Sequence, residues 1–198
     1  MTTVLAFAVI ALWLVVAVMA LMMWVMLRQI GILYERIAPV GALMDSAGPK
    51  IGEASPFFQL SSETGGTIEI GGAGTKSVLV FFLSPTCPVC KQLLPVLDDI
   101  QSAERAWLDV VLASDGSPEK HAGFIKHQKL SGFPYVLSTD LGMAYRVQRL
   151  PFAVLLDPAG TVRSKGLINN REQLESLFNA LDTGVASVQQ LQSIREVV

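Results

Sequence analysis

An uncharged run of 24 residues near the N-terminus divides this chain into an apolar segment and a separate folded part. From Val4 to Leu27 no Asp, Glu, Lys or Arg occurs, and no Gly or Pro interrupts the run. As a helix it would be about 36 Å long, enough to cross a hydrocarbon core of roughly 30 Å. A cleaved secretory signal normally has an apolar region of only about 7–15 residues preceded by Lys or Arg, and neither precedes this run. We therefore expect an uncleaved membrane anchor.

Few charges flank the anchor, so they bear weakly on its orientation. Arg28 and Arg36 follow the run, Glu35 lies beside Arg36, and no Lys or Arg comes before it. The positive-inside rule, applied to these charges, places the C-terminal part in the cytoplasm. The chemistry of the folded part, described below, favours the opposite side of the membrane.

Composition places one globular domain after the anchor. The chain is 51% hydrophobic, and much of that excess lies at the N-terminus, which excludes a wholly disordered protein. The net charge of −2 gives no indication of a nucleic-acid partner. We expect four segments, namely an anchor at residues 1–28, a juxtamembrane linker at 29–50, one domain at 51–183 and a C-terminal tail at 184–198.

The domain alternates between apolar strand patterns and amphipathic helix patterns. Ser77–Leu83 is a continuous apolar run rich in β-branched and aromatic residues, which is typical of a strand buried on both faces. This alternation predicts an α/β fold with a mixed central sheet and helices on both faces. Helices are expected at 88–106, 118–130, 142–146 and 171–181, and further strands at 56–60, 65–70, 109–114, 135–137, 152–156 and 161–167.

Both cysteines of the chain lie in the motif Cys87-Pro88-Val89-Cys90, which follows the predicted buried strand and begins a predicted helix. A Cys-x-x-Cys motif in this context is a redox signature. The two-residue spacing lets the sulfurs meet across one helical turn, and the free amides at the helix N-terminus favour a thiolate at Cys87. Cys90, one turn further in, is shielded and would resolve a mixed disulfide. Pro88 suits the first helical turn, where an N–H has no partner.

Other uses of the two cysteines are weaker. So close together, they cannot staple distant segments, which excludes a disulfide scaffold. A zinc site needs four ligands, and the only further soft candidates are His121 and His127, which fall on different sides of one predicted helix. We therefore expect no metal, no cofactor beyond the dithiol itself, and two solvated surface histidines.

Two prolines complete the pattern. Pro151 follows Leu150 at the head of the strand predicted for 152–156, where proline is tolerated in either isomer. Pro95 lies inside the helix after the cysteine motif, eight residues beyond Cys87, where proline bends a helix. Each proline taken alone is a local feature, but both have counterparts around the dithiol of one known fold.

With these residues the domain resembles the thioredoxin superfamily, and in particular its membrane-anchored, extracytoplasmic branch. The resemblance implies a thioredoxin-like fold preceded by one transmembrane helix. By position, Cys87 would be the attacking thiol and Cys90 the resolving thiol. Leu150 and Pro151 would form the cis-proline loop that faces the dithiol and binds client backbone, with Pro88 as a further client-binding residue. The matching segments are Gly52–Phe57, Val78–Leu83, Cys87–Cys90, Pro95, Leu150–Pro151 and Leu156–Gly160.

More narrowly, Ser84–Lys91, the single anchor and the length near 200 residues resemble the thioredoxin-like accessory proteins of bacterial methylamine utilisation. That resemblance implies a thiol-disulfide oxidoreductase that helps form or rearrange disulfides during maturation of a disulfide-rich periplasmic client. The implied client is the small subunit of methylamine dehydrogenase, which carries a tryptophan-derived quinone. An oxidising periplasm suits a membrane-tethered dithiol better than the cytoplasm does. We therefore expect a single-pass protein of the bacterial inner membrane with its domain in the periplasm.

The sequence also departs from thioredoxin, so it fits several functions. Thr86 replaces the tryptophan before the first cysteine, and the strand at Val78–Leu83 lacks the buried carboxylate of thioredoxin. Oxidase and isomerase differ by reduction potential, which the sequence does not give. A peroxiredoxin-like peroxidase also fits, because Ser84 lies three residues before Cys87, although Val80 replaces the expected proline. Two further functions that fit are a membrane-tethered assembly partner without catalysis and a reductant for cytochrome c maturation.

Overall fold

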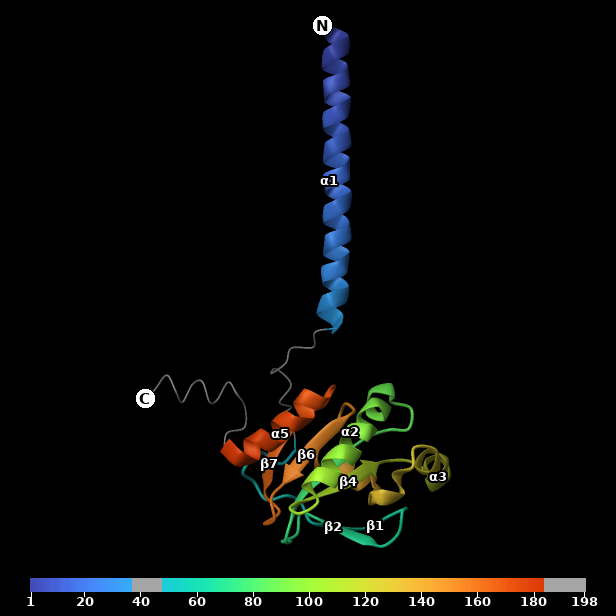
Figure 1. Cartoon of the computed structure of the whole chain (residues 1–198), viewed down its shortest axis with the longest axis vertical. Coiled ribbons are helices and arrows are strands. Elements are labelled where there is room, and N and C mark those ends of the chain that lie inside the picture. The colour runs from blue at the N-terminus through green and yellow to red at the C-terminus, as the bar shows by residue number, and fades with distance from the viewer. Residues whose placement is uncertain (37–47, 184–198) are drawn as a thin grey trace, which may run out of the picture. The chain divides into compact units, whose positions relative to one another are not determined.

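The computed structural model describes the chain at residues 1–36 and 48–183, in two compact units, Met1–Leu43 and Met44–Val198. The linker predicted for 29–50 falls partly outside the described residues, and the tail predicted for 184–198 falls wholly outside them. Figure 1 shows the single helix of the first unit and the layered domain of the second.

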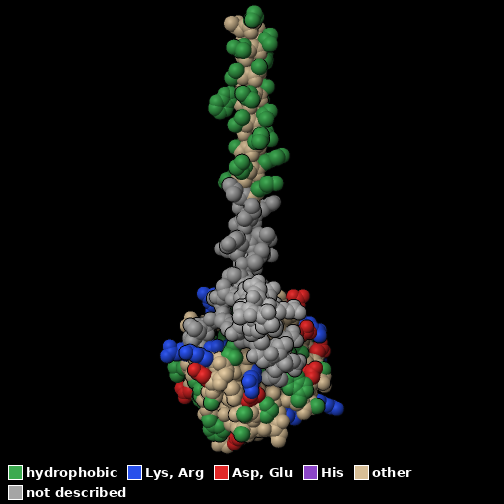
Figure 2. All heavy atoms as spheres, turned by 90° about the vertical axis from the view of Figure 1, so that its left-hand side faces the viewer, with side chains coloured by type: hydrophobic (Ala, Val, Ile, Leu, Met, Phe, Trp, Pro, Cys, Tyr) green, Lys and Arg blue, Asp and Glu red, His purple; other side chains and the backbone are tan. Residues whose placement is uncertain are grey.

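The first unit contains one long helix, α1 (Thr2–Arg36). Its segment Thr2–Met26 is long and apolar enough to cross a membrane, and its most apolar stretch has no buried residue. Trp13 and Trp24 are 69% and 60% exposed, and Figure 2 shows hydrophobic side chains along the visible side of the helix. Water solvates so continuous an apolar surface poorly, so this helix has the properties of a membrane-spanning segment.

The second unit contains a five-stranded mixed sheet in the order β5-β4-β3-β6-β7 and a separate two-stranded hairpin, β1-β2. Strands β3, β4 and β5 are parallel, whereas β6 is antiparallel to both β3 and β7. The central position therefore belongs to β3. The strands are β1 (Phe58–Ser61), β2 (Thr67–Ile70), β3 (Ser77–Phe82), β4 (Leu108–Ser114), β5 (Tyr135–Leu137), β6 (Phe152–Leu156) and β7 (Val162–Leu167).

Helices cover both faces of the five-stranded sheet, as the sequence predicted for an α/β fold. Buried side chains of α2, α3 and α5 form one core, and a buried side chain of α4 belongs to a second core. Figure 1 shows α2 and α5 lying across the same side of the sheet. The helices are α2 (Pro88–Glu104), α3 (Pro118–His127), the 3-10 turn η1 (Leu130–Gly132), α4 (Thr139–Ala144) and α5 (Arg171–Thr183).

Strand β3 separates these two cores. Successive side chains of a strand point to opposite faces, so Leu79 and Phe81 join the core under α2 while Val80 and Phe82 join the core under α4. All four are at most 4% exposed. A strand buried on both faces requires an uninterrupted apolar sequence, so the prediction for Ser77–Leu83 is confirmed.

All four helices differ from their predicted bounds, and two of them differ by three residues at one end. α4 begins at Thr139 rather than Gly142, because the Ser138 hydroxyl caps it by accepting a backbone N–H three residues on at 3.1 Å. Apolar spacing alone misses this polar first turn. α3 ends at His127 rather than at residue 130, since Lys129 adopts a left-handed backbone with φ 57° that a helix cannot continue.

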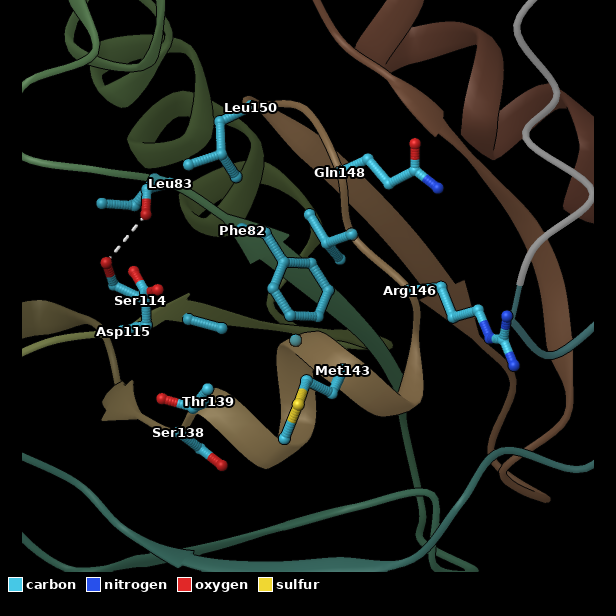
Figure 3. Close-up of a pocket in the computed structure, with 13 residues that line it drawn as sticks. Phe82, Leu83, Ser114, Asp115, Ser138, Thr139, Met143, Arg146, Gln148 and Leu150 are labelled. Atoms are coloured by element: carbon cyan, nitrogen blue, oxygen red, sulfur yellow. Dashed lines mark hydrogen bonds between the residues drawn. The ribbon is translucent and has the colours of Figure 1, made fainter.

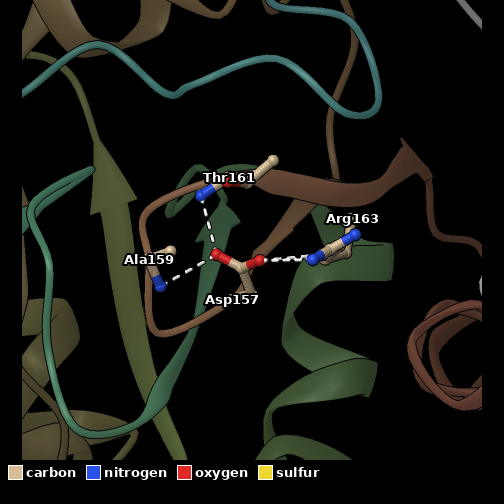
Figure 4. Close-up of polar contacts among 4 residues, drawn as sticks. All are labelled: Asp157, Ala159, Thr161 and Arg163. Atoms are coloured by element: carbon tan, nitrogen blue, oxygen red, sulfur yellow. Dashed lines mark hydrogen bonds and ion pairs between the residues drawn. The ribbon is translucent and has the colours of Figure 1, made fainter.

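The turn between β6 and β7 is held by one carboxylate (Figure 4). Asp157 Oδ1 accepts hydrogen bonds from the N–H groups of Ala159 at 2.9 Å and Thr161 at 2.8 Å. Its Oδ2 accepts one from Arg163 Nε at 2.8 Å. Burial acts to raise the pKa of Asp157, but these donors outweigh burial and hold the pKa below its ordinary value. Because β6 is antiparallel to β3, this turn lies at the end of the sheet where β3 begins.

Candidate functional site

The structure places the two cysteines in different surroundings at the start of α2. Both are free thiols. Cys87 is the N-cap residue and is partly exposed, and its sulfur accepts a hydrogen bond from the Cys90 backbone N–H at 3.2 Å. Cys90 has 0% of its surface exposed. Pro88 occupies the first helical position and is exposed. Of the two sulfurs, Cys87 is therefore the one accessible to a partner from solution.

Burial separates the chemistry of the two sulfurs. Burial, reinforced by the hydrogen bond and the charge of Cys87, raises the pKa of Cys90 to about 12, against the opposing effect of a backbone hydrogen bond from Ser84. Cys90 is therefore a protonated thiol near neutral pH. Cys87 accepts the Cys90 amide hydrogen bond at the N-terminus of α2 and is partly exposed. The arrangement therefore places the Cys87 sulfur where a partner can reach it and keeps the Cys90 thiol shielded from solvent.

The loop between β3 and α2 is held by its own hydrogen bonds. The Cys87 N–H donates to the Ser84 carbonyl at 3.1 Å. The Ser84 and Thr86 hydroxyls lie 3.0 Å apart, and the Thr86 N–H donates to Ser84 Oγ at 3.4 Å. These contacts hold Cys87 at the end of the sheet where β3 stops.

The Leu150–Pro151 peptide bond is cis, as the thioredoxin resemblance implied. Phe152, the next residue, pairs with Phe82 at the end of β3, so Pro151 lies at the sheet end from which the cysteine loop departs. Pro151 is buried, and its carbonyl accepts the Ile168 N–H at 3.1 Å. Leu150 is 38% exposed. The fold thus brings Leu150 and Pro151 to the same end of the sheet as the two cysteines.

A cavity of about 410 Å³ opens at this end of the sheet, beside helix α4 (Figure 3). It lies at the carboxyl ends of β3 and β4, where open α/β sheets commonly bind ligands. Because Leu83 and Leu150 both line it, the cavity adjoins the cysteine loop and the cis-proline loop. We call it the α4 cavity, defined by its lining residues Phe82, Leu83, Asp115, Met143, Arg146 and Leu150.

The structure corrects one prediction about the histidines. His127 is exposed as predicted, but His121 is buried, with 3% of its surface exposed. Its Nε2 lies 2.9 Å from the Asp115 carbonyl and its Nδ1 lies 2.8 Å from the Tyr135 hydroxyl. A carbonyl only accepts, so Nε2–H donates to Asp115, while Nδ1 and the Tyr135 hydroxyl share the second hydrogen bond. These two bonds replace water and make burial of the ring possible.

This histidine–tyrosine pair adds polar groups to the core that contains Cys90, and the sequence reasoning missed it. Burial raises the pKa of Tyr135 to about 12, a hydrogen bond with Ser114 acts in the opposite direction, and the charge of Cys90 raises it further. Ser114 Oγ in turn donates to the Leu83 carbonyl at 2.8 Å, just before the cysteine loop. Helical spacing of His121 with apolar residues of α3 was the available signal.

Metal ligands do not gather around this site in the part of the chain that the structure describes. No three His, Cys, Asp or Glu side chains there lie close enough to hold a metal ion. Both ring nitrogens of His121 are engaged by the hydrogen bonds described above. What the described residues offer at this site is the redox chemistry of two sulfurs.

A mixed sheet, an N-cap cysteine with a buried partner one turn further, and a cis-proline at the same sheet end define a thioredoxin-like dithiol protein. Solved structures share this fold. A candidate thiol:disulfide interchange protein, DsbE, of Chlorobium tepidum has a TM-score of 0.61 at 21% identity, covering 67% of this chain and 98% of that one. The thioredoxin domain of a Bacteroides vulgatus thiol-disulfide oxidoreductase has a TM-score of 0.57 at 22% identity, covering 69% and 98%.

Sequence comparison identifies the family to which this thioredoxin-like protein belongs. Residues 51–176 match the AhpC/TSA family. The methylamine utilization protein MauD of Paracoccus versutus is 43% identical over 94% of this chain and 94% of its own length. MauD of Paracoccus denitrificans is 42% identical over 99% and 98%. The chain belongs to the MauD family of methylamine utilization proteins, within the AhpC/TSA family.

Proposed function

We propose that this protein is a membrane-anchored periplasmic thiol-disulfide oxidoreductase of methylamine utilisation, which forms or rearranges disulfides in the small subunit of methylamine dehydrogenase. The observation that carries the proposal is the asymmetry of the dithiol. Cys87 is partly exposed and accepts an amide hydrogen bond, whereas Cys90 is fully buried and protonated. The pathway comes from the MauD relatives, whose names place them in methylamine utilisation.

The proposed exchange begins with the Cys87 thiolate attacking one sulfur of a client disulfide. A bond forms between Cys87 and that sulfur, the client disulfide breaks, and the second client sulfur leaves as a thiolate that takes a proton from solvent. Cys90 then loses its proton, attacks the Cys87 sulfur and releases the first client sulfur as a thiolate, which also takes up a proton. The client has gained two electrons and two protons, and the protein holds a Cys87–Cys90 disulfide.

The same steps in reverse oxidise a client dithiol. When the client resolves the mixed disulfide with another of its own cysteines, the result is isomerisation without net electron transfer. The exposed positions of Pro88 and Leu150 and the placement of Pro151 at this sheet end support their proposed role as the client-binding border.

A trapping experiment tests the client. Cys90→Ser leaves Cys87 free to form a mixed disulfide that nothing resolves, so the full-length variant should retain the small subunit through a reducible bond. Cys87→Ser is the matched control and should retain nothing. Absence of the small subunit from the Cys90→Ser adduct would overturn the proposed client. A Cys87→Ser protein that still supports maturation would favour an assembly partner without catalysis.

The proposed location rests on the apolar helix and on the redox chemistry. Helix α1 is long and apolar enough for one crossing, and disulfide exchange with secreted clients occurs in the oxidising periplasm. The positive-inside rule, applied to Arg28 and Arg36, points the other way. A membrane-impermeant maleimide applied to intact spheroplasts should label Cys87. Labelling only after lysis would place the domain in the cytoplasm.

Peroxidase activity is a second candidate, because the AhpC/TSA match and 27% identity to a chloroplastic peroxiredoxin Q from Populus jackii favour it. The local geometry disfavours peroxidase activity, because the hydroxyl of Ser84 is engaged with the hydroxyl of Thr86. We expect no consumption of hydrogen peroxide by the reduced protein under conditions in which it reduces disulfides. Catalytic turnover of peroxide that depends on Cys87 would reverse this ranking.

A further inference from the structure

Helix α4 ends in a backbone turn that most often contains glycine. The helix C-cap is Tyr145, and the next residue, Arg146, has a left-handed backbone with φ 51°. The Arg146 N–H donates to the Met143 carbonyl at 3.0 Å. The Val147 N–H donates to the Gly142 carbonyl at 3.0 Å. These are the two bonds of a Schellman motif, whose left-handed position favours glycine because glycine lacks a Cβ. Arg146 therefore stands where its side chain adds backbone strain.

That side chain belongs to the lining of the α4 cavity. Figure 3 shows Arg146 and Asp115 on opposite sides of the cavity, with Phe82 between them. A non-glycine residue held in a left-handed conformation is a reason to look for a role of its side chain. Here the side chain supplies the positive charge in the wall of a cavity next to the cysteine loop.

The cavity also gathers exposed apolar surface. In the second unit, the large hydrophobic side chains exposed among the described residues are Phe57, Met143 and Leu150, at 60%, 62% and 38%. Met143 and Leu150 both line the α4 cavity, and Leu150 also precedes the cis-proline. Exposed apolar side chains collected in a concave site indicate a binding surface.

The positive charge of Arg146 in the wall of the α4 cavity determines which ligands the cavity favours. Arg146 is exposed and forms no ion pair with another described residue, so its guanidinium is open to a ligand. A guanidinium presents a planar fork of donors that matches a carboxylate. Asp115, on the opposite side, favours only one orientation of an acidic ligand.

We propose that the α4 cavity is a client subsite, which seats an apolar side chain of an extended client segment while Arg146 binds a carboxylate beside it. The inference rests on the proposed function, because the segment is one whose cysteine reacts with Cys87. It names the class of client sequence, an acidic residue next to a large apolar residue within a few positions of the reacting cysteine.

Short cysteine peptides test this specificity. Each peptide is offered to the reduced full-length protein in detergent as its mixed disulfide with 5-thio-2-nitrobenzoate, whose release is followed by absorbance. The reference peptide carries Phe and Glu within three residues of its cysteine, and versions with the pair on either side are used. Replacing Phe by Ala, or Glu by Gln, should each lower the second-order rate constant by roughly tenfold.

Substitution of Arg146 locates the charge selectivity. In Arg146→Gly, which suits the left-handed backbone, the Glu-to-Gln rate ratio should fall to about one, and Arg146→Lys should retain part of it. Because the ratio is taken within one variant, a change in dithiol reactivity cancels. Arg149→Gln is the matched control, since it removes the same charge from a neighbouring position outside the cavity lining, and it should keep the ratio.

Filling the cavity tests the apolar part. A Cβ at Gly142 meets no atom within 4 Å, and Gly142 lines the cavity. In Gly142→Leu, the ratio of the rate constants for the Phe and Ala peptides should fall to about one. Gly123→Leu is the matched control, because Gly123 is also helical, its Cβ also meets no atom within 4 Å, and it lies in α3. It should leave the ratio unchanged.

The outcomes separate this inference from the proposed function. If the wild type reacts with all peptides at one rate while exchanging with oxidised glutathione, the subsite is wrong and the oxidoreductase proposal stands. Unchanged ratios in Arg146→Gly and Gly142→Leu would overturn the subsite equally. If the wild type reacts with neither the peptides nor oxidised glutathione, the proposed function itself fails.

Discussion

The two ends of the five-stranded sheet differ in how their polar groups are paired. At the end where β3 begins, Asp157 is supplied with donors by its own turn and by Arg163. At the opposite end, Cys87 is partly exposed, and Arg146 forms no ion pair with another described residue. Asp157 at the first end is hydrogen-bonded within the domain, whereas Cys87 and Arg146 at the other end are available to molecules in solution.

This difference separates residues that stabilise the fold from residues that take part in disulfide exchange or client binding. The partly buried carboxylate of Asp157, whose partners come from its own turn and from Arg163, contributes to folding, because removing it leaves these donors without their acceptor. A thiol or guanidinium that awaits an external partner contributes little to folding. Substitutions at the two ends should therefore change different measurements, stability at the Asp157 turn and exchange rate at the cysteines.

The largest expected effect is the loss of exchange in Cys87→Ser. A serine hydroxyl is not ionised near neutral pH and attacks disulfides poorly, so the rate constant for disulfide exchange should fall on the order of a thousandfold or more. The measurement is reduction of oxidised glutathione by the full chain in detergent. Cys90→Ser is the control, since it should still form the mixed disulfide. Substantial exchange by Cys87→Ser would show that disulfide exchange does not depend on the cysteine end of the sheet.

At the other end, Asp157→Ala should lower the free energy of unfolding by about 2 kcal/mol, because the turn N–H groups and Arg163 lose their acceptor. Chemical denaturation in detergent measures this loss, and the exchange rate should stay at the wild-type value. Since the pKa of Asp157 is lowered on folding, its stabilisation is present above pH 3.8 and disappears as the pH falls through the folded value. A slowed exchange in Asp157→Ala would contradict the separation.

A pH experiment examines the buried cysteine. Folding raises the pKa of Cys90 from 9.0 to about 12, so the unfolded chain loses this proton first, and stability falls as the pH rises above 9. Between pH 9 and 11 the reduced wild type should lose about 2 kcal/mol more than Cys90→Ala. Denaturation at several pH values gives the two slopes. Equal slopes would mean that Cys90 is not held protonated by the fold.

The smallest expected effect concerns the left-handed arginine. Arg146→Gly should raise the free energy of unfolding by about 0.5 kcal/mol, because glycine removes the Cβ strain and the side chain has no paired charge to lose. Lys129→Gly is a matched control, since Lys129 also has a left-handed backbone, with φ 57°, in a different loop. A clear loss of stability in Arg146→Gly alone would assign Arg146 a structural role.

Local patterns predicted most of the elements. The bounds of β5 and β6 agree with prediction at both ends, and the apolar run of β3 identified a strand buried on both faces. The Cys-x-x-Cys motif with proline at the first helical position predicted where α2 begins. The resemblance to thioredoxins implied the cis peptide bond at Pro151. The predictions of β5, β6, β3 and the start of α2 succeed because each depends on residues within a few positions of one another, whereas the cis peptide bond came from the resemblance.

The sequence by itself determined the apolar anchor pattern, the order of strands and helices, and the placement of two thiols one helical turn apart. Tertiary structure alone decided that His121 is buried against Tyr135 and that the α4 cavity opens beside the cysteine loop. The physical reason is that burial and charge environment depend on which distant segments pack together. Short-range residue patterns carry backbone conformation, whereas the solvation of a side chain is set by neighbours that only the folded chain supplies.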